Sequence, residues 1–194
     1  MYIKKSILLF ASLLFITLNL FAQQDARLME RIDGVLKVTQ SKDLDKILDY
    51  TYPKLFTIVS REQMTEALKG SFETDEFIAS FDSVIVKTVF PVFTIKDAQY
   101  AKISHTMIMR MKFKTPIDST GSVTFKELME PKFGKGNISF NQQDNTFNIY
   151  MLSYLAAIKD EFSKDWSFVN YDEESGMIGL LFSAEVIEKF KAYK

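Results

Sequence analysis

The only histidine of the chain, His105, lies in a segment where methionine recurs at every second position. The segment 103–113 reads ISHTMIMRMKF, and strand geometry would project alternate side chains to one face. Thioether sulfur and imidazole nitrogen are ligands that suit copper(I). Ligands two residues apart on a strand are, however, separated by about 6.5 to 7 Å. The residues that would share the face are Ile103, His105, Met107, Met109, Met111 and Phe113.

Three uses of this face are open: a copper(I) site, the wall of an apolar ligand pocket, or plain core. The histidine and the methionines cannot all reach one ion without a bulge in the strand or help from Met151. Methionine is also a flexible filler of irregular apolar space, which favours the core or the pocket over the metal. The residues that we expect to line a pocket are Tyr50, His105, Met107, Met109, Met111, Phe147, Met151 and Trp166.

Other catalytic and metal chemistry has little support in the sequence. One histidine and no cysteine exclude a cysteine nucleophile and a zinc site built from several such residues. No G-x-S-x-G or phosphate-binding G-x-x-x-x-G-K motif is present. Asp43, Asp45 and Asp49 lack the glycine turn and distal glutamate of a calcium loop, so we expect a solvated helix face there. We predict no catalytic residue, no resident metal and no cofactor.

The first 22 residues have the pattern of a signal peptide. Lys4 and Lys5 precede an apolar run that is short for a membrane span, and Ala22 follows that run before a polar stretch. Leu20 occupies a position where a small residue is preferred, so an uncleaved anchor stays open as the alternative. We predict a signal peptide at 1–22 and export to the periplasm or the medium, with no membrane segment in the mature chain.

Composition limits the possible partners and the domain organisation of the mature chain. Removing Lys4 and Lys5 changes the formal charge from -1 to about -3. A weakly acidic chain without a basic stripe argues against nucleic acid as a partner. Nothing resembling a linker divides residues 23–194, which suits a single domain. Because cysteine is absent, stability must come from packing without disulfides.

Periodicity predicts helices first and strands afterwards. Helices are expected in 24–39, from Asp43 to a break at Pro53, and in 60–70, where Ser60 and Gln63 form a capping box and Gly70 ends the helix. Strands are expected in 81–95 with an interruption at Pro91, then in 99–114, 123–125, 137–140, 146–158 and 165–171. The segment 126–136 is expected to be a loop or a brief helical turn, and 182–193 a terminal helix capped by Ser183.

Segregated helices and antiparallel strands predict an α+β fold, with N-terminal helices on a strongly curved antiparallel sheet and a C-terminal helix. The order of DLDKILDYTYPKLF, REQMTEAL and the strands ending in DWSFVNYD resembles the NTF2-like superfamily, whose cystatin-like cone fold is shared by SnoaL-like and ketosteroid isomerase-like proteins. The resemblance covers residues 25–172 approximately. It implies a pocket between the helices and the concave face of the sheet.

The function implied by that resemblance ranges from enzymes to binders, because fold alone does not decide function. An isomerase would need a tyrosine, for which Tyr50 and Tyr52 are the nearest candidates, and an inward acid. No acid interrupts 103–113 or 146–158. We therefore favour a non-enzymatic exported protein that binds an apolar or amphipathic small molecule. The alternative is a structural or homodimerising envelope protein, and a copper-binding or enzymatic protein is less favoured.

Overall fold

The structure is a computed structural model that describes residues 26–193, so the predicted signal peptide at 1–22 lies outside the described residues. The chain divides into two units, Met1–Gly34 and Val35–Lys194. Of the first unit, residues 26–34 are described and are helical. The second unit contains the sheet and the remaining helices, and with them every predicted site residue. The single domain expected for 23–194 stays a prediction.

The helices that precede the sheet lie where the sequence predicts them. Residues 35–41 are helical. α2 spans Leu44–Tyr50 with Asp43 as its N-cap, and the 3-10 helix η1 spans Pro53–Thr57, so Pro53 ends the α-helix as expected. α3 spans Arg61–Phe72, and its capping box of Ser60 and Gln63 is confirmed.

Two details of the α3 prediction are wrong. Gly70 does not end the helix, which continues to Phe72. Phe72 is buried and its ring lies 5.6 Å from that of Phe81, a contact that outweighs the small helical cost of one glycine. The hydrophobic spacing of this helix also predicts a buried side that includes Ala67, but Ala67 is exposed.

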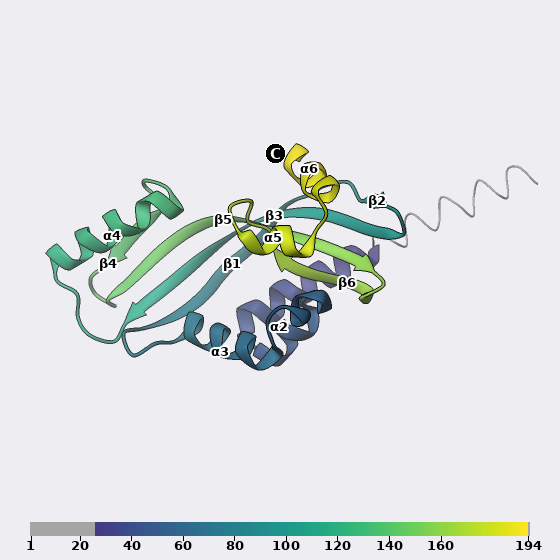
Figure 1. Cartoon of the computed structure of the whole chain (residues 1–194). Helices are drawn as coiled ribbons and strands as arrows, with labels where there is room; N and C mark the ends of the chain where they lie inside the picture. The colour runs from purple at the N-terminus through teal and green to yellow at the C-terminus, as the bar shows by residue number, and fades with distance from the viewer. Residues whose placement is uncertain (1–25, 194) are drawn as a thin grey trace, which may run out of the picture. The chain divides into compact units, whose positions relative to one another are not determined.

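The sheet has six antiparallel strands, and it is curled without closing (Figure 1). The strands are β1 (Phe77–Val89), β2 (Phe93–Ile95), β3 (Ala98–Phe113), β4 (Ile138–Asn141), β5 (Thr146–Asp160) and β6 (Ser163–Asn170). The long strands β3 and β5 form the centre. β1 and β2 pair with β3, and β4 and β6 pair with β5. Pro91 lies in the break between β1 and β2, as its missing N–H donor requires.

A 15-residue helix, α4 (Ser119–Phe133), replaces the predicted strand 123–125, and it is much longer than the brief helical turn that was one of the two alternatives for 126–136. The carboxylate of Asp118 accepts a hydrogen bond from the Gly121 N–H and caps the helix. Phe125, Met129 and Phe133 recur at helical spacing and pack on the α4 cluster of the sheet. The buried members of this cluster are Ala79, Met111, Ile138, Phe147 and Ile149. Weak helix formers at the start of α4 suggested a strand, and this tertiary contact overrides them.

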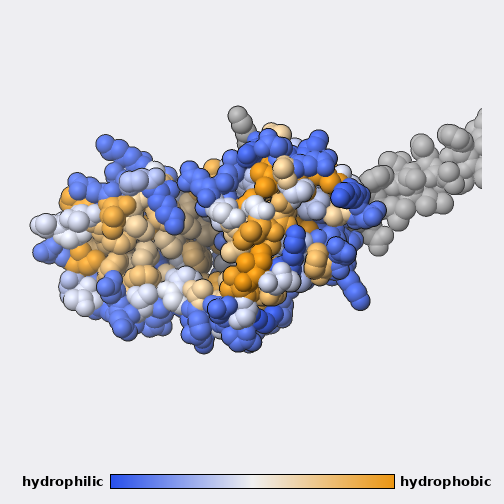
Figure 2. Space-filling view, viewed as in Figure 1, coloured by the Kyte–Doolittle hydropathy of each residue, from blue (hydrophilic) through white to orange (hydrophobic). Residues whose placement is uncertain are grey.

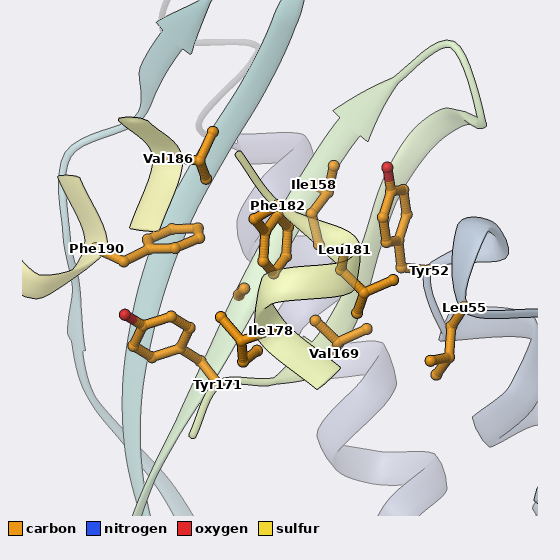
Figure 3. Close-up of a cluster of buried hydrophobic side chains, with 11 residues drawn as sticks. Tyr52, Leu55, Ile158, Val169, Tyr171, Ile178, Leu181, Phe182, Val186 and Phe190 are labelled. Carbon is orange, nitrogen blue, oxygen red and sulfur yellow. The ribbon is translucent and has the colours of Figure 1, made fainter. Parts of the chain in front are cut away.

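The C-terminal helices cover part of the opposite sheet face. α5 (Gly176–Leu181) was not predicted, whereas α6 (Ala184–Ala192) and its N-cap Ser183 were. The buried residues of this C-terminal cluster are Tyr52, Leu55, Ala156, Ile158, Val169, Tyr171, Ile178, Leu181, Phe182, Val186 and Phe190 (Figure 3). The ring of Phe190 lies 5.0 Å from that of Tyr171 and 5.6 Å from that of Phe182. The α+β class is therefore confirmed, with helices before the sheet and after it.

Candidate functional site

The register of β3 and β5 assembles a continuous row of soft side chains, which we call the methionine face. Its members are His105, Met107, Met109, Met111 and Met151. Met107 lies directly opposite Met151, and His105 lies opposite Ser153. Side chains directly opposite in an antiparallel pair have Cβ atoms about 5 Å apart. The alternation predicted from sequence is thus present, and Met151 joins the row from the neighbouring strand.

His105, Met107 and Met111 of the methionine face are buried, whereas Met109 and Met151 are only partly covered. Met111 lies in the α4 cluster at one end. On the β1 side, Phe81 is opposite Met109 and contacts Phe72 of α3. Met109, Met151 and Phe81 are half-buried although they lie well inside the strands. In Figure 2, hydrophobic atoms gather in a hollow beside α4, the helix that packs on this face.

A β-bulge in β1 lies beside Met107. The register with β3 shifts between Asp82 and Ile85, and Ser83 has a φ of 51°. Few residues other than glycine adopt that backbone region. A bulge bends its strand and redirects nearby side chains. The ligands can converge on one ion only with a bulge in the strand or with help from Met151. The structure places Met151 opposite Met107, and the bulge lies in the neighbouring strand β1.

His105 is the one ionisable side chain among the members of the methionine face. It is 2% exposed, and its Nδ1 has no hydrogen-bond partner among the described residues. Burial lowers the pKa of the imidazole below its ordinary value, since the charged form loses hydration. The side chain is therefore neutral at pH 7, with a nitrogen lone pair available to a donor or a soft metal.

The eight predicted pocket residues are not all brought together. Met107, Met109 and Met151 are neighbours, with His105 beside them. Phe147 is fully buried under α4, where its ring centroid lies 4.2 Å from that of Phe125. Tyr50 and Trp166 lie toward β6: Tyr50 is 6.4 Å from the ring of Phe168, and Trp166 is itself a buried β6 residue. Their role in a ligand site stays a prediction.

A tyrosine and an acid do meet, but at the hairpin that joins β5 to β6. The Tyr52 hydroxyl donates to Asp160 Oδ2 at 2.5 Å. Burial and the adjacent carboxylate raise the pKa of Tyr52. Asp160 Oδ1 accepts the N–H groups of Phe162 and Ser163, so this carboxylate also holds the turn. Tyr52 follows α2 instead of lying on it, and it belongs to the C-terminal cluster on the other sheet face.

Sequence reasoning missed a buried lysine on that other face. Lys102 is 3% exposed, and its ammonium donates to the carbonyl oxygens of Phe190 at 3.1 Å and Tyr193 at 2.8 Å. It also lies 4.4 Å from the ring centroid of Tyr154. Burial lowers the pKa of Lys102, partly opposed by Glu173, whose carboxylate lies 3.8 Å away. Since its donors bind the carbonyls at the end of α6, Lys102 anchors that helix.

Residues 26–193 contain no group of three or more His, Asp or Glu side chains placed to hold a metal ion. Within the same range, no helix is both long and apolar enough to cross a membrane. Comparison with protein-family models, with curated proteins and with solved structures finds no match.

Proposed function

We propose that this chain binds an apolar or amphipathic small molecule on the methionine face. The observation that carries the proposal is that Met109, Met151 and Phe81 stay half-buried, although the two methionines pack against the α4 cluster and Phe81 contacts Phe72 of α3. Apolar side chains gain free energy when they leave water, about 25 cal/mol per Å². A ligand that covers these side chains would supply that burial.

The chemistry of the face suits an apolar ligand whose shape is not fixed in advance. Methionine is flexible and polarizable, so it adapts to irregular partners. The neutral imidazole of His105 adds one unpaired nitrogen, Nδ1, at one end of the row. No Asp, Glu, Lys or Arg belongs to the row, so nothing in it demands a charged ligand. An amphipathic ligand would keep its polar end in solvent.

The fold family, the non-enzymatic role and the export of the chain are proposals as well. We propose an NTF2-like, non-enzymatic protein exported by its N-terminal segment. The order of helices, long antiparallel strands and terminal helix supports the first part. The Tyr52–Asp160 hydrogen bond belongs to the β5–β6 turn, because the same carboxylate accepts the Phe162 N–H, and this supports a structural role for the pair.

A matched pair of variants tests ligand binding. Met151 and its neighbour Leu152 project to opposite faces of β5, so Met151→Gln and Leu152→Gln change polarity equally on the two sides. The mature protein would be titrated with an environment-sensitive naphthalene dye and then with lauric acid as competitor. We expect Met151→Gln to weaken both by tenfold or more, and Leu152→Gln to leave them unchanged. Equal binding by the two variants, or no binding by the natural protein, would contradict the proposal.

A second candidate, homodimer formation, is favoured by the opposite face of the sheet. There Ile85, Tyr150 and Leu152 are exposed, at 52%, 44% and 56%, beside half-buried Ile108. We call these four residues the outer patch. Arg110 borders it, 3.5 Å from Asp82 and 3.6 Å from Asp144. A surface that carries both charges next to apolar residues is complementary to a two-fold copy of itself.

The occupant proposed for the outer patch is therefore a second copy of this chain. Sedimentation velocity across a hundredfold range of concentration would show a monomer–dimer equilibrium. We expect Leu152→Gln to shift that equilibrium to monomer and Met151→Gln to leave it unchanged, the reverse of the ligand result. A natural protein that stays monomeric throughout would rule this candidate out.

A further inference from the structure

The buried imidazole of His105 has a polar atom that the fold does not use. Its Nδ1 has no hydrogen-bond partner among the described residues, and the side chain is almost fully buried. Buried polar atoms are nearly always paired, so one without a partner calls for a ligand, an ion or a water. The direct cross-strand neighbours of His105 are Val86 and Ser153, and neither side chain is charged.

Two methionines, Met107 and Met151, are neighbours of His105 on the same face of the sheet. Met107 follows His105 by two residues on the same face, and Met151 is the residue directly across from Met107. Met151 is therefore the diagonal neighbour of His105, at about 7 Å between Cα atoms. Methionine has three rotatable bonds, so both sulfurs can swing toward a point between the three residues. One strand alone holds its ligands too far apart, but β3 and β5 together bring His105, Met107 and Met151 around one point.

We propose that His105, Met107 and Met151 form a copper(I) site. Two thioether sulfurs and one imidazole nitrogen make a soft donor set, which selects copper(I) over zinc, calcium or magnesium. No carboxylate or second imidazole belongs to the methionine face to attract a harder ion. Half-buried Met109 and Met151 are the thioethers that solvent reaches, so an ion would enter from their side.

This site does not depend on the proposed apolar ligand, although Met151 takes part in both. The substitution Met151→Leu separates them, because leucine keeps the apolar surface and the approximate volume but removes the sulfur. The variant should bind lauric acid as the natural protein does and lose copper. Met151→Gln should lose both.

The test is a copper(I) titration of the mature protein under anaerobic reducing conditions, in competition with a bathocuproine chelator. We expect one equivalent to bind, with affinity reduced at least tenfold in Met107→Leu and in Met151→Leu. Met177→Leu, on α5 in the C-terminal cluster, is the matched control and should bind as the natural protein does. X-ray absorption of the complex should report two sulfur ligands and one nitrogen ligand.

Three results would overturn the copper site: no binding by the natural protein, unchanged affinity in both leucine variants, or an equal loss in Met177→Leu. The urea midpoint of each variant shows whether it is folded. If a leucine variant is unfolded, the absorption spectrum of the natural protein decides alone, and the absence of sulfur ligands would refute the site. Failure of copper binding would leave the apolar-ligand result untouched.

Discussion

At the scale of single residues, the most informative feature is that His105 is neutral and buried beside thioethers. The sequence identifies the histidine and its methionine neighbours by type and spacing. It names Met151 but does not place it opposite Met107, and it does not identify the unpaired Nδ1, because both depend on the packing of β3 and β5. Lys102 illustrates the same limit: alternation places it on a face, but its two carbonyl partners lie far along the chain.

The lowered pKa of His105 predicts a pH dependence of stability. The unfolded chain takes up a proton near pH 6.5, whereas the folded chain does so only at lower pH. Between these values the unfolded state binds more protons, so the free energy of unfolding falls as the pH falls below about 6.5. The loss should not exceed about 1.4 kcal/mol per pH unit. Urea unfolding from pH 8 to pH 5 measures it.

Replacing the imidazole provides the control for that titration. His105→Met should show a flatter profile between pH 6.5 and pH 5, because it removes the titrating group while keeping an apolar side chain. An identical profile in the variant would mean that other groups cause the pH dependence.

At the scale of elements, α6 is held by a buried cation at its C-terminal end. Lys102→Met leaves the carbonyl oxygens of Phe190 and Tyr193 without these donors. An unsatisfied buried acceptor costs about 1 to 3 kcal/mol, so we expect a loss of that size in urea unfolding. Amide hydrogen exchange should accelerate in α6 first. Lys189→Met, at an exposed position of the same helix, should change stability by less than about 0.5 kcal/mol. Equal effects of the two substitutions would contradict the anchoring role.

α4 frames the methionine face and depends on a cap that sequence patterns contain. Asp118→Ala removes the side-chain acceptor for the Gly121 N–H and should cost about 1 kcal/mol in urea unfolding. Glu127→Ala, on the exposed side of α4, should be close to neutral. No difference between the two variants would show that the cap contributes nothing measurable.

Comparison of the elements shows which signals the sequence carries. Capping residues and Pro53 located α2, α3 and α6 correctly, since these effects are local. α4 was mistaken for a strand because Val123 and Thr124 favour strands, although Asp118 and the spacing of Phe125, Met129 and Phe133 pointed to a helix. α5 was missed because it is short and is stabilised by packing of Ile178 and Leu181 in the C-terminal cluster.

At the scale of the second unit, we propose different functions for the two faces of the sheet: dimer formation for one and ligand binding for the other. The C-terminal helices cover part of one face, and the exposed outer patch lies on the same face. The other face carries α4 at one end, with partly covered methionines beside it. The α+β class followed from the order of helices and strands. Which parts of each face stay uncovered could not follow from sequence, because cover depends on where distant helices pack.

The central claim is that a small apolar molecule contacts the middle of the methionine face. Methyl-¹³C labelling of methionine reports on it directly, since Met107, Met109 and Met151 lie on that face and Met64 and Met177 pack against the C-terminal cluster. On titration with lauric acid, we predict that the methyl resonances of the first three shift together and saturate. The resonances of Met64 and Met177 should stay in place. Shifts confined to Met64 and Met177, or no shift at any methionine, would contradict the claim.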